Sequence, residues 1–133
     1  MPLKKSLETS MNFYEALGRE YQLLYNFTEK HELSIHEFKL LLIIYKNKSI
    51  QLRSIIQSEM MKTNQINKAV KNLYDKKLIH KERVPLDERT VELSIREDQM
   101  DYVSKLIKSF ATVVEKFQDE DSQQEDSQNE DNQ

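Results

Sequence analysis

The sequence predicts an α+β domain that is mainly helical. Apolar residues recur at spacings of three and four near both ends of the chain, a pattern typical of amphipathic helices. Two segments between them, 78–84 and 90–95, alternate apolar with polar residues and are typical of strands. The chain has 133 residues, one glycine, two prolines and no cysteine. This composition allows one domain and excludes disulfides, thiolate chemistry and glycine-rich phosphate loops.

The first predicted helix runs from about Ser6 to His31. One stripe follows it, formed by Leu7, Met11, Tyr14, Leu17, Tyr21, Leu24 and Thr28. Gly18 lies inside this stripe and would let another backbone come close. A second helix begins at Ser34, because the segment from Ser34 to Glu37 fits the S/T-x-x-E capping box. Apolar residues on nearly every side of that helix predict that it is buried in the middle of the domain.

The middle of the chain has the element order of a winged helix. A short edge strand at 50–52 and a short helix at 53–60 are followed by Thr63, a plausible N-cap for a helix over 64–77. Two helices joined by a few polar residues have the spacing of a helix-turn-helix. The strands 78–84 and 90–95, connected by a turn at 85–89, then form an antiparallel hairpin.

The last predicted helix starts at about Asp98 and has an apolar seam. Leu106 and Val113 lie beside this seam and can serve the domain's own packing. Apolar helices at both chain ends either cover the domain's own core or pack across a two-fold axis, and we favour a homodimer. The expected dimer residues are Leu7, Tyr14, Leu17, Tyr21 and Leu24, with Met100, Val103, Ile107, Phe110, Val114 and Phe117.

The chain ends in an acidic segment. Residues 118–133 contain no apolar side chain, and they hold seven of the 23 acidic residues but none of the 20 basic ones. Such a segment cannot bury enough apolar surface to offset its ordering entropy, so we expect disorder there. We therefore divide the chain into a winged-helix domain, 1–117, which is mildly basic, and an acidic tail, 118–133. The tail is either a solubility appendage or a competitor for a basic site.

The predicted helix 64–77 carries polar residues in a basic region. Residues 62–83 hold seven basic and two acidic side chains. In a winged helix, this helix enters the major groove of DNA and the hairpin contacts the backbone or the minor groove. Asn and Gln can bond adenine edges, whereas Lys meets guanine or phosphate. The expected DNA contacts are Lys62, Thr63, Asn64, Gln65, Asn67, Lys68, Lys71, Lys81, Arg83 and, at the hairpin tip, Arg89.

The hairpin also resembles that of a known family. Lys81-Glu82-Arg83, followed by Pro85-Leu86-Asp87-Glu88-Arg89-Thr90-Val91, is similar to the wing of the staphylococcal accessory regulator (Sar) family of MarR-type winged helices. The resemblance implies a homodimeric transcription regulator of A·T-rich promoters, often of virulence, adhesion or biofilm genes. It matches Arg83 and Arg89 to DNA-contacting wing arginines, and Asp87 and Glu88 to the acidic pair that supports the wing. The oxidation sensing of some members needs a cysteine that this chain lacks.

Other functions have less support in the sequence. The three histidines form neither HxxxH nor HExxH, so we expect no metal site. The carboxylates are scattered and no serine lies in a G-x-S-x-G turn, so we expect no enzyme activity, and we expect no other cofactor. The main alternative is a winged-helix module that binds a protein instead of DNA, which would not need the basic surplus. No apolar run approaches the roughly 18–20 residues of a membrane span, and we expect a cytoplasmic protein without membrane contact. A small-molecule effector could bind between the dimerisation helices and the DNA-binding lobe, but no residue cluster marks such a pocket.

Overall fold

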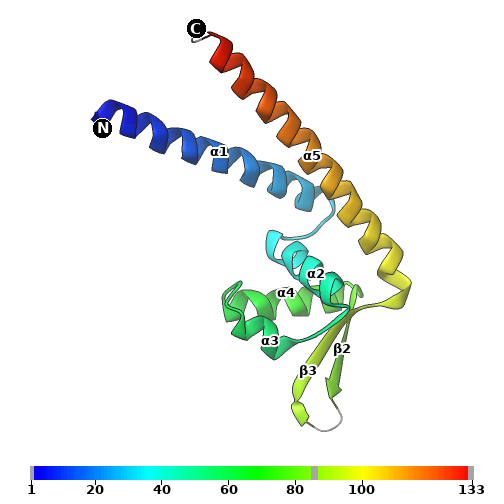
Figure 1. Cartoon of the computed structure of the whole chain (residues 1–133). Coiled ribbons are helices and arrows are strands. Elements are labelled where there is room, and N and C mark those ends of the chain that lie inside the picture. The colour runs from blue at the N-terminus through cyan, green and yellow to red at the C-terminus, as the bar shows by residue number, and fades with distance from the viewer. Residues whose placement is uncertain (1, 85–86, 132–133) are drawn as a thin grey trace.

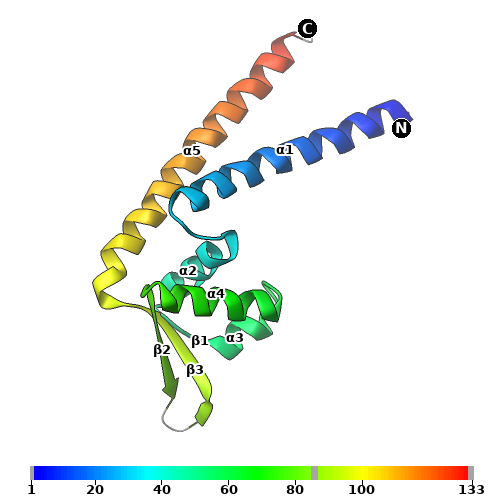
Figure 2. The same cartoon turned by 180° about the vertical axis from the view of Figure 1, so that it is seen from behind.

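The structure, a computed structural model, describes residues 2–84 and 87–131, with the side chains of 84, 87–89 and 123–131 outside that description. Two long helices, α1 (Leu3–Lys30) and α5 (Met100–Asp131), extend away from a small lobe (Figure 1). Seen from behind, the ends of α1 and α5 that lie away from the lobe are opposite the hairpin (Figure 2). The lobe contains α2 (Ile35–Asn47), β1 (Ser49–Gln51), α3 (Leu52–Gln57), α4 (Thr63–Asp75), β2 (Ile79–Val84) and β3 (Asp87–Ile95), and the 3-10 turn η1 (Glu97–Gln99) leads to α5.

This order of elements confirms the mainly helical α+β fold with a helix-turn-helix and a hairpin. The three strands form an antiparallel sheet in the order β1-β3-β2, so that Leu93 on β3 has Ile50 on one side and Lys81 on the other. Among the described residues, no helix is long and apolar enough to cross a membrane.

The hairpin is closed more tightly than the sequence predicted. Because Val84 pairs with Asp87, the strand that we expected at 90–95 begins at Asp87. Arg89 therefore lies within β3, which corrects its expected place at the hairpin tip. The register shifts between Arg83 and Val84, as at a β-bulge. Residues 85 and 86, part of the expected turn, lie outside the described residues.

Helix α2 lies at the centre of the lobe, as predicted. Its side chains Phe38, Leu40, Leu41 and Ile44 are each at most 1% exposed. Complete burial of one such side chain contributes about 1.5–3 kcal/mol. They share one core with residues of α3, α4 and β3, namely Ile55, Ile66, Leu73 and Leu93. This core fixes α4 against α2.

Three phenylalanine rings join α2 to the two long helices. The ring centre of Phe27 on α1 lies 5.5 Å from that of Phe38 on α2 and 4.9 Å from that of Phe110 on α5. The centres of Phe38 and Phe110 are 5.0 Å apart. The C-terminal end of α1 and the first turns of α5 are thereby packed on the lobe.

The same packing corrects the expected role of the α5 seam. Val103 is completely buried within its own chain, and Ile107 and Phe110 pack against the chain's own core. At Phe110 the reason is that the rings of Phe27 on α1 and Phe38 on α2 lie against its ring. Leu106 and Val113 also serve this core, as expected. The seam residues with exposed or half-buried side chains that do not belong to this core are Met100, Val114 and Phe117.

Most of the predicted apolar stripe on α1 is exposed. The side chains of Leu7, Met11, Tyr14, Leu17 and Tyr21 keep between 50% and 73% of their surface accessible. Leu24, the next stripe residue, packs against the core instead, because it lies near the base of the helix. A large exposed apolar row of this kind is a candidate interaction surface.

Four helices end beside a residue with left-handed backbone. Glu32, Lys48, Glu59 and Lys77 stand at the ends of α1, α2, α3 and α4, with φ between 56° and 63°. This conformation is unfavourable for a residue with a Cβ atom by about 1–2 kcal/mol. It terminates α3 and α4 earlier than the apolar pattern predicted, at Gln57 and Asp75.

The acidic run differs from the disorder that we expected. Helix α5 continues as far as Asp131. Once a helix is nucleated, each added residue only has to propagate it, and Glu and Gln are good helix formers. No glycine or proline interrupts the chain after Pro85. The acidic residues thus extend α5 away from the lobe, and an ion pair of 3.5 Å joins Asp121 to Arg19 of α1.

Candidate nucleic-acid interface

Helix α4 packs one face on the core and turns another to solvent. Its buried residues are Ile66, Ala69, Val70 and Leu73. The helix residues that we expected to contact DNA lie on the other side, and all are exposed except Gln65, which is half-buried: Lys62, Thr63, Asn64, Gln65, Asn67, Lys68 and Lys71. The structure therefore brings the helical part of the predicted set together on the solvent side of one helix.

The start of α4 differs by one residue from the prediction. The N-cap is Lys62, whereas Thr63 is the first residue of the helix. The backbone N–H of Lys62 donates to Oε1 of Gln65 at 3.3 Å, and the N–H of Gln65 donates to Oδ1 of Asn64 at 2.9 Å. These bonds satisfy donors that a helix start otherwise leaves unpaired. The amide NH2 group of Gln65 takes part in neither of these two bonds.

Two polar residues in the second half of α4 bond inside the lobe. Nδ2 of Asn72 donates to Oε2 of Glu37 at 3.3 Å. Nζ of Lys76, counted in the basic surplus, lies 2.6 Å from Oε1 of Glu37. The charge of Lys76 is therefore balanced within the chain.

Glu37 is a buried carboxylate with partners on both oxygens. Ser34 caps α2 as predicted, since its side chain accepts the Glu37 N–H at 3.1 Å. In a capping box, the Glu37 carboxylate would in turn accept from the backbone N–H of Ser34. Here that carboxylate turns toward α4 and accepts from Asn72 and Lys76. Burial raises the pKa of Glu37, but hydrogen bonds from Lys76, Ser34 and Asn72 and the charge of Lys76 outweigh burial, so that the pKa is lowered.

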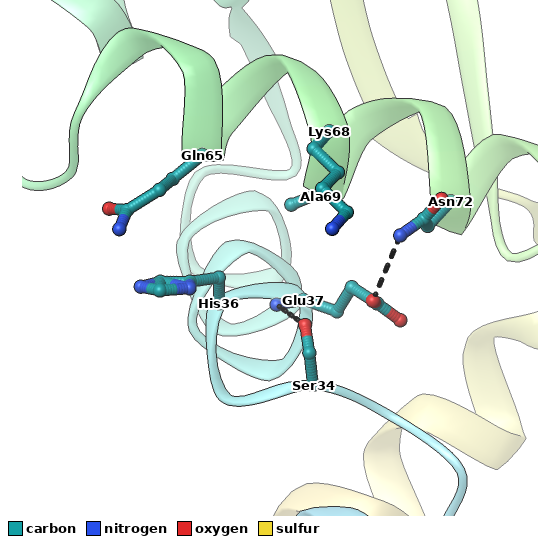
Figure 3. A pocket seen from close by; sticks show the side chains of 7 residues that line it. All are labelled: Ser34, His36, Glu37, Gln65, Lys68, Ala69 and Asn72. Carbon is teal, nitrogen blue, oxygen red and sulfur yellow. Dashed lines mark hydrogen bonds between the residues drawn. The ribbon is translucent and has the colours of Figure 1, made fainter.

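A groove of about 410 Å³ lies between the start of α2 and α4 (Figure 3). His36 lies opposite Gln65 in this groove, and Lys68 extends from α4 on the same side. Sequence reasoning did not place His36 beside the candidate surface, because only the packing of α2 on α4 brings the two segments together. The full lining is Ser34, His36, Glu37, Gln65, Lys68, Ala69 and Asn72.

The first strand of the hairpin adds two cations beside α4. Lys81 and Arg83 are exposed and two positions apart, so they lie on one face of β2. Nζ of Lys81 is 4.2 Å from the ring centre of Tyr74 on α4, a cation–π contact that ties the strand to the helix. The side chains of Asp87, Glu88 and Arg89 lie outside the description, and their predicted roles stay predictions.

The comparison with protein families decides the class of this protein. The family model described as "Transcriptional regulator SarA/Rot" matches residues 19–106, more than half of the chain. The chain belongs to the SarA/Rot family. The match spans the lobe and every residue predicted to contact DNA. No curated protein matches the chain.

Solved structures show how widely the fold of this SarA/Rot protein is shared. A MarR-like regulator from Bacillus cereus has a TM-score of 0.70 at 11% identity, over 85% of this chain and 81% of that one. The F27L mutant of S. aureus MepR, bound to an oligodeoxyribonucleotide, gives 0.68 at 16% identity, over 93% and 91%. Wild-type MarR from E. coli gives 0.63 at 14% identity, over 81% and 75%. At these identities the likeness concerns the fold.

Proposed function

We propose that this SarA/Rot protein is a homodimeric DNA-binding transcription regulator that prefers A·T-rich duplexes. The observation that carries the proposal is the exposed Asn and Lys surface of α4 beside the cations of β2. An α-helix fits the major groove, where Asn67 can bond an adenine edge and Lys68 and Lys71 can meet guanine or phosphate. The structure of S. aureus MepR with an oligodeoxyribonucleotide supports DNA as the partner.

The exposed cations of this surface supply the affinity in this proposal. Lys76 is not among them, because Glu37 neutralises it. Each phosphate that a cation neutralises releases counterions, and binding weakens accordingly as salt rises. The contributing residues are Lys62, Lys68, Lys71, Lys81 and Arg83, with Arg89 on β3 as the candidate for the minor groove.

A second copy of the chain is the proposed cover for the stripe on α1. Leu7, Tyr14, Leu17 and Tyr21 are at least half exposed, and Met100 on α5 is 41% exposed. Burying this row in a two-fold dimer removes the apolar surface from water and pairs two α4 helices for two half-sites. The resemblance of the hairpin to the Sar family supports promoters of virulence, adhesion or biofilm genes as the targets.

The test is fluorescence anisotropy of an A·T-rich and a G·C-rich duplex across a salt series. The double variant Lys68→Ala/Lys71→Ala should bind more weakly, and its slope of log K against log salt should fall by about 0.9 for each lost phosphate contact. The matched control is Lys105→Ala/Lys108→Ala, which removes two exposed cations with the same spacing from α5. Equal, shallow slopes for all three proteins would contradict the proposal and favour a protein-binding module.

A further inference from the structure

One side chain ties α4 to the end of α1. Nζ of Lys76, the C-cap residue of α4, lies 2.6 Å from Oε1 of Glu37 and donates to the backbone carbonyl of Glu32 at 2.5 Å. Glu32 follows α1, and Glu37 lies in the first turn of α2. Asn72, one turn earlier on α4, donates to the other oxygen of Glu37. Three hydrogen bonds thus join the second half of α4 to the junction between α1 and α2.

The groups that receive these bonds are held in place. The side chain of Glu37 is 6% exposed, and the Ser34 cap fixes the turn that carries it. The turn at Glu32 is closed by bonds from the N–H of Glu32 to Glu29 and from the N–H of Leu33 to Thr28, at 3.0 and 2.9 Å. Lys76 therefore binds two anchored acceptors.

Apolar packing alone does not supply the same constraint. The phenylalanine contacts between α1, α2 and α5 bury apolar surface, and the hydrophobic attraction that holds them together is non-directional. Charge-assisted hydrogen bonds are short and directional, and a buried carboxylate that loses its cation is left uncompensated. The bonds of Lys76 define an angle between α4 and α1, whereas the core defines their proximity.

We propose that Lys76 is a positioning residue that sets the orientation of α4 relative to α1. The inference rests on the proposed function for its consequence: α1 carries the dimer surface and α4 the DNA surface, so this angle sets how the two α4 helices of a dimer face two half-sites. Lys76 acts through the helix and does not contact DNA.

The experiment measures that orientation within one chain. The protein has no cysteine, so Glu20→Cys on α1 and Asn67→Cys on α4, both at exposed positions, provide two unique sites for spin labels. Labelled chains are diluted with unlabelled chains, and pulsed electron resonance gives the distribution of distances between the labels. The test variant is Lys76→Met, and the matched control is Lys77→Met, which removes the exposed neighbouring charge.

We expect Lys76→Met to broaden or shift the distance distribution at a temperature where circular dichroism shows it folded, and Lys77→Met to leave it unchanged. Lys76→Arg, which keeps a cation for both acceptors, should restore the distribution. Glu37→Gln, which removes the charge and keeps the shape, should broaden it and serves as a second variant should Lys76→Met not fold. A purely structural role would lower the melting temperature and leave the distribution of the folded protein intact.

The functional consequence is measured with a duplex selected from a random-sequence library by the unaltered chain. If about a tenth of Lys76→Met molecules hold the productive angle, affinity for this duplex falls roughly tenfold, while Lys77→Met stays near the unaltered value. An unchanged distance distribution in Lys76→Met overturns the inference, even if the unaltered chain binds DNA. A broadened distribution in a chain that selects no duplex supports the positioning role and contradicts the proposed function.

Discussion

Removal of the acidic run from α5 should have little effect on DNA binding. The magnitude follows from the length of the helix. Asp119 is about 28 Å along α5 from Met100 at 1.5 Å per residue, and Met100 is the end of α5 at the lobe. The hairpin lies on the far side of the lobe from the chain end (Figures 1 and 2). Two unit charges 28 Å apart in water interact by about 0.15 kcal/mol before screening.

Salt reduces this interaction much further. At physiological ionic strength the screening length is about 8 Å, so a separation of 28 Å attenuates it roughly thirtyfold. Summed over seven acids and about five cations, the total stays below about 0.2 kcal/mol, a factor of less than roughly 1.5 in affinity. We therefore expect that the segment does not compete for the basic surface of its own chain.

The assay compares three proteins by anisotropy with the same A·T-rich duplex. They are the full chain, residues 1–117, and a full-length variant in which the seven acids of 118–133 are replaced by Asn and Gln. The last variant separates the loss of charge from the loss of helix. Fivefold tighter binding by both altered proteins in low salt, vanishing in high salt, would refute the reasoning and show that the acidic run reaches a basic surface.

Three further perturbations test separate features. The lowered pKa of Glu37 stabilises the folded protein, and this stability is fully present at any pH above the ordinary pKa of 4.5 and is lost as the pH falls through the folded-state pKa. In urea titrations, the wild type should therefore lose more unfolding free energy between about pH 6 and about pH 3 than Glu37→Gln. Glu59→Gly should raise the unfolding free energy by about 0.5–1 kcal/mol, since glycine accepts the left-handed backbone at this position. A Glu59→Ala protein as stable as Glu59→Gly would contradict this explanation. Tyr21→Glu places a charge in the exposed stripe and should shift sedimentation velocity to the monomer, whereas Asn12→Glu on the opposite face of α1 should not; a dimeric Tyr21→Glu protein would assign the dimer surface elsewhere.

The order of elements could be predicted because each has its own periodicity. The apolar residues on nearly every side of α2 indicated its central burial, and the alternation in 78–84 and 90–95 indicated the hairpin. These are local signals, since the repeat of apolar residues in a helix or strand can be recognised within one short segment of the sequence. The exposed polar side of α4 followed in the same way, because the buried positions Ile66, Ala69, Val70 and Leu73 define the opposite face.

The structure differs from the sequence-based predictions where segments that are distant in the sequence come into contact. Glu37 fits a capping box locally, but its carboxylate binds Lys76 and Asn72, which spacing within α2 cannot indicate. Val103 has the spacing of a dimer seam, yet it is completely buried within its own chain. The end of α3 depends on the left-handed backbone at Glu59, a residue type without a strong preference for that conformation.

If the exposed stripe on α1 is the proposed dimer surface, the number of paired chains depends steeply on the abundance of the protein. With dimerisation through this surface, the concentration of paired chains rises with the square of the total concentration as long as most chains are single. A twofold increase in synthesis then gives close to a fourfold increase in molecules able to occupy two half-sites. Promoter occupancy would respond to gene dosage with a threshold, without any ligand or covalent modification.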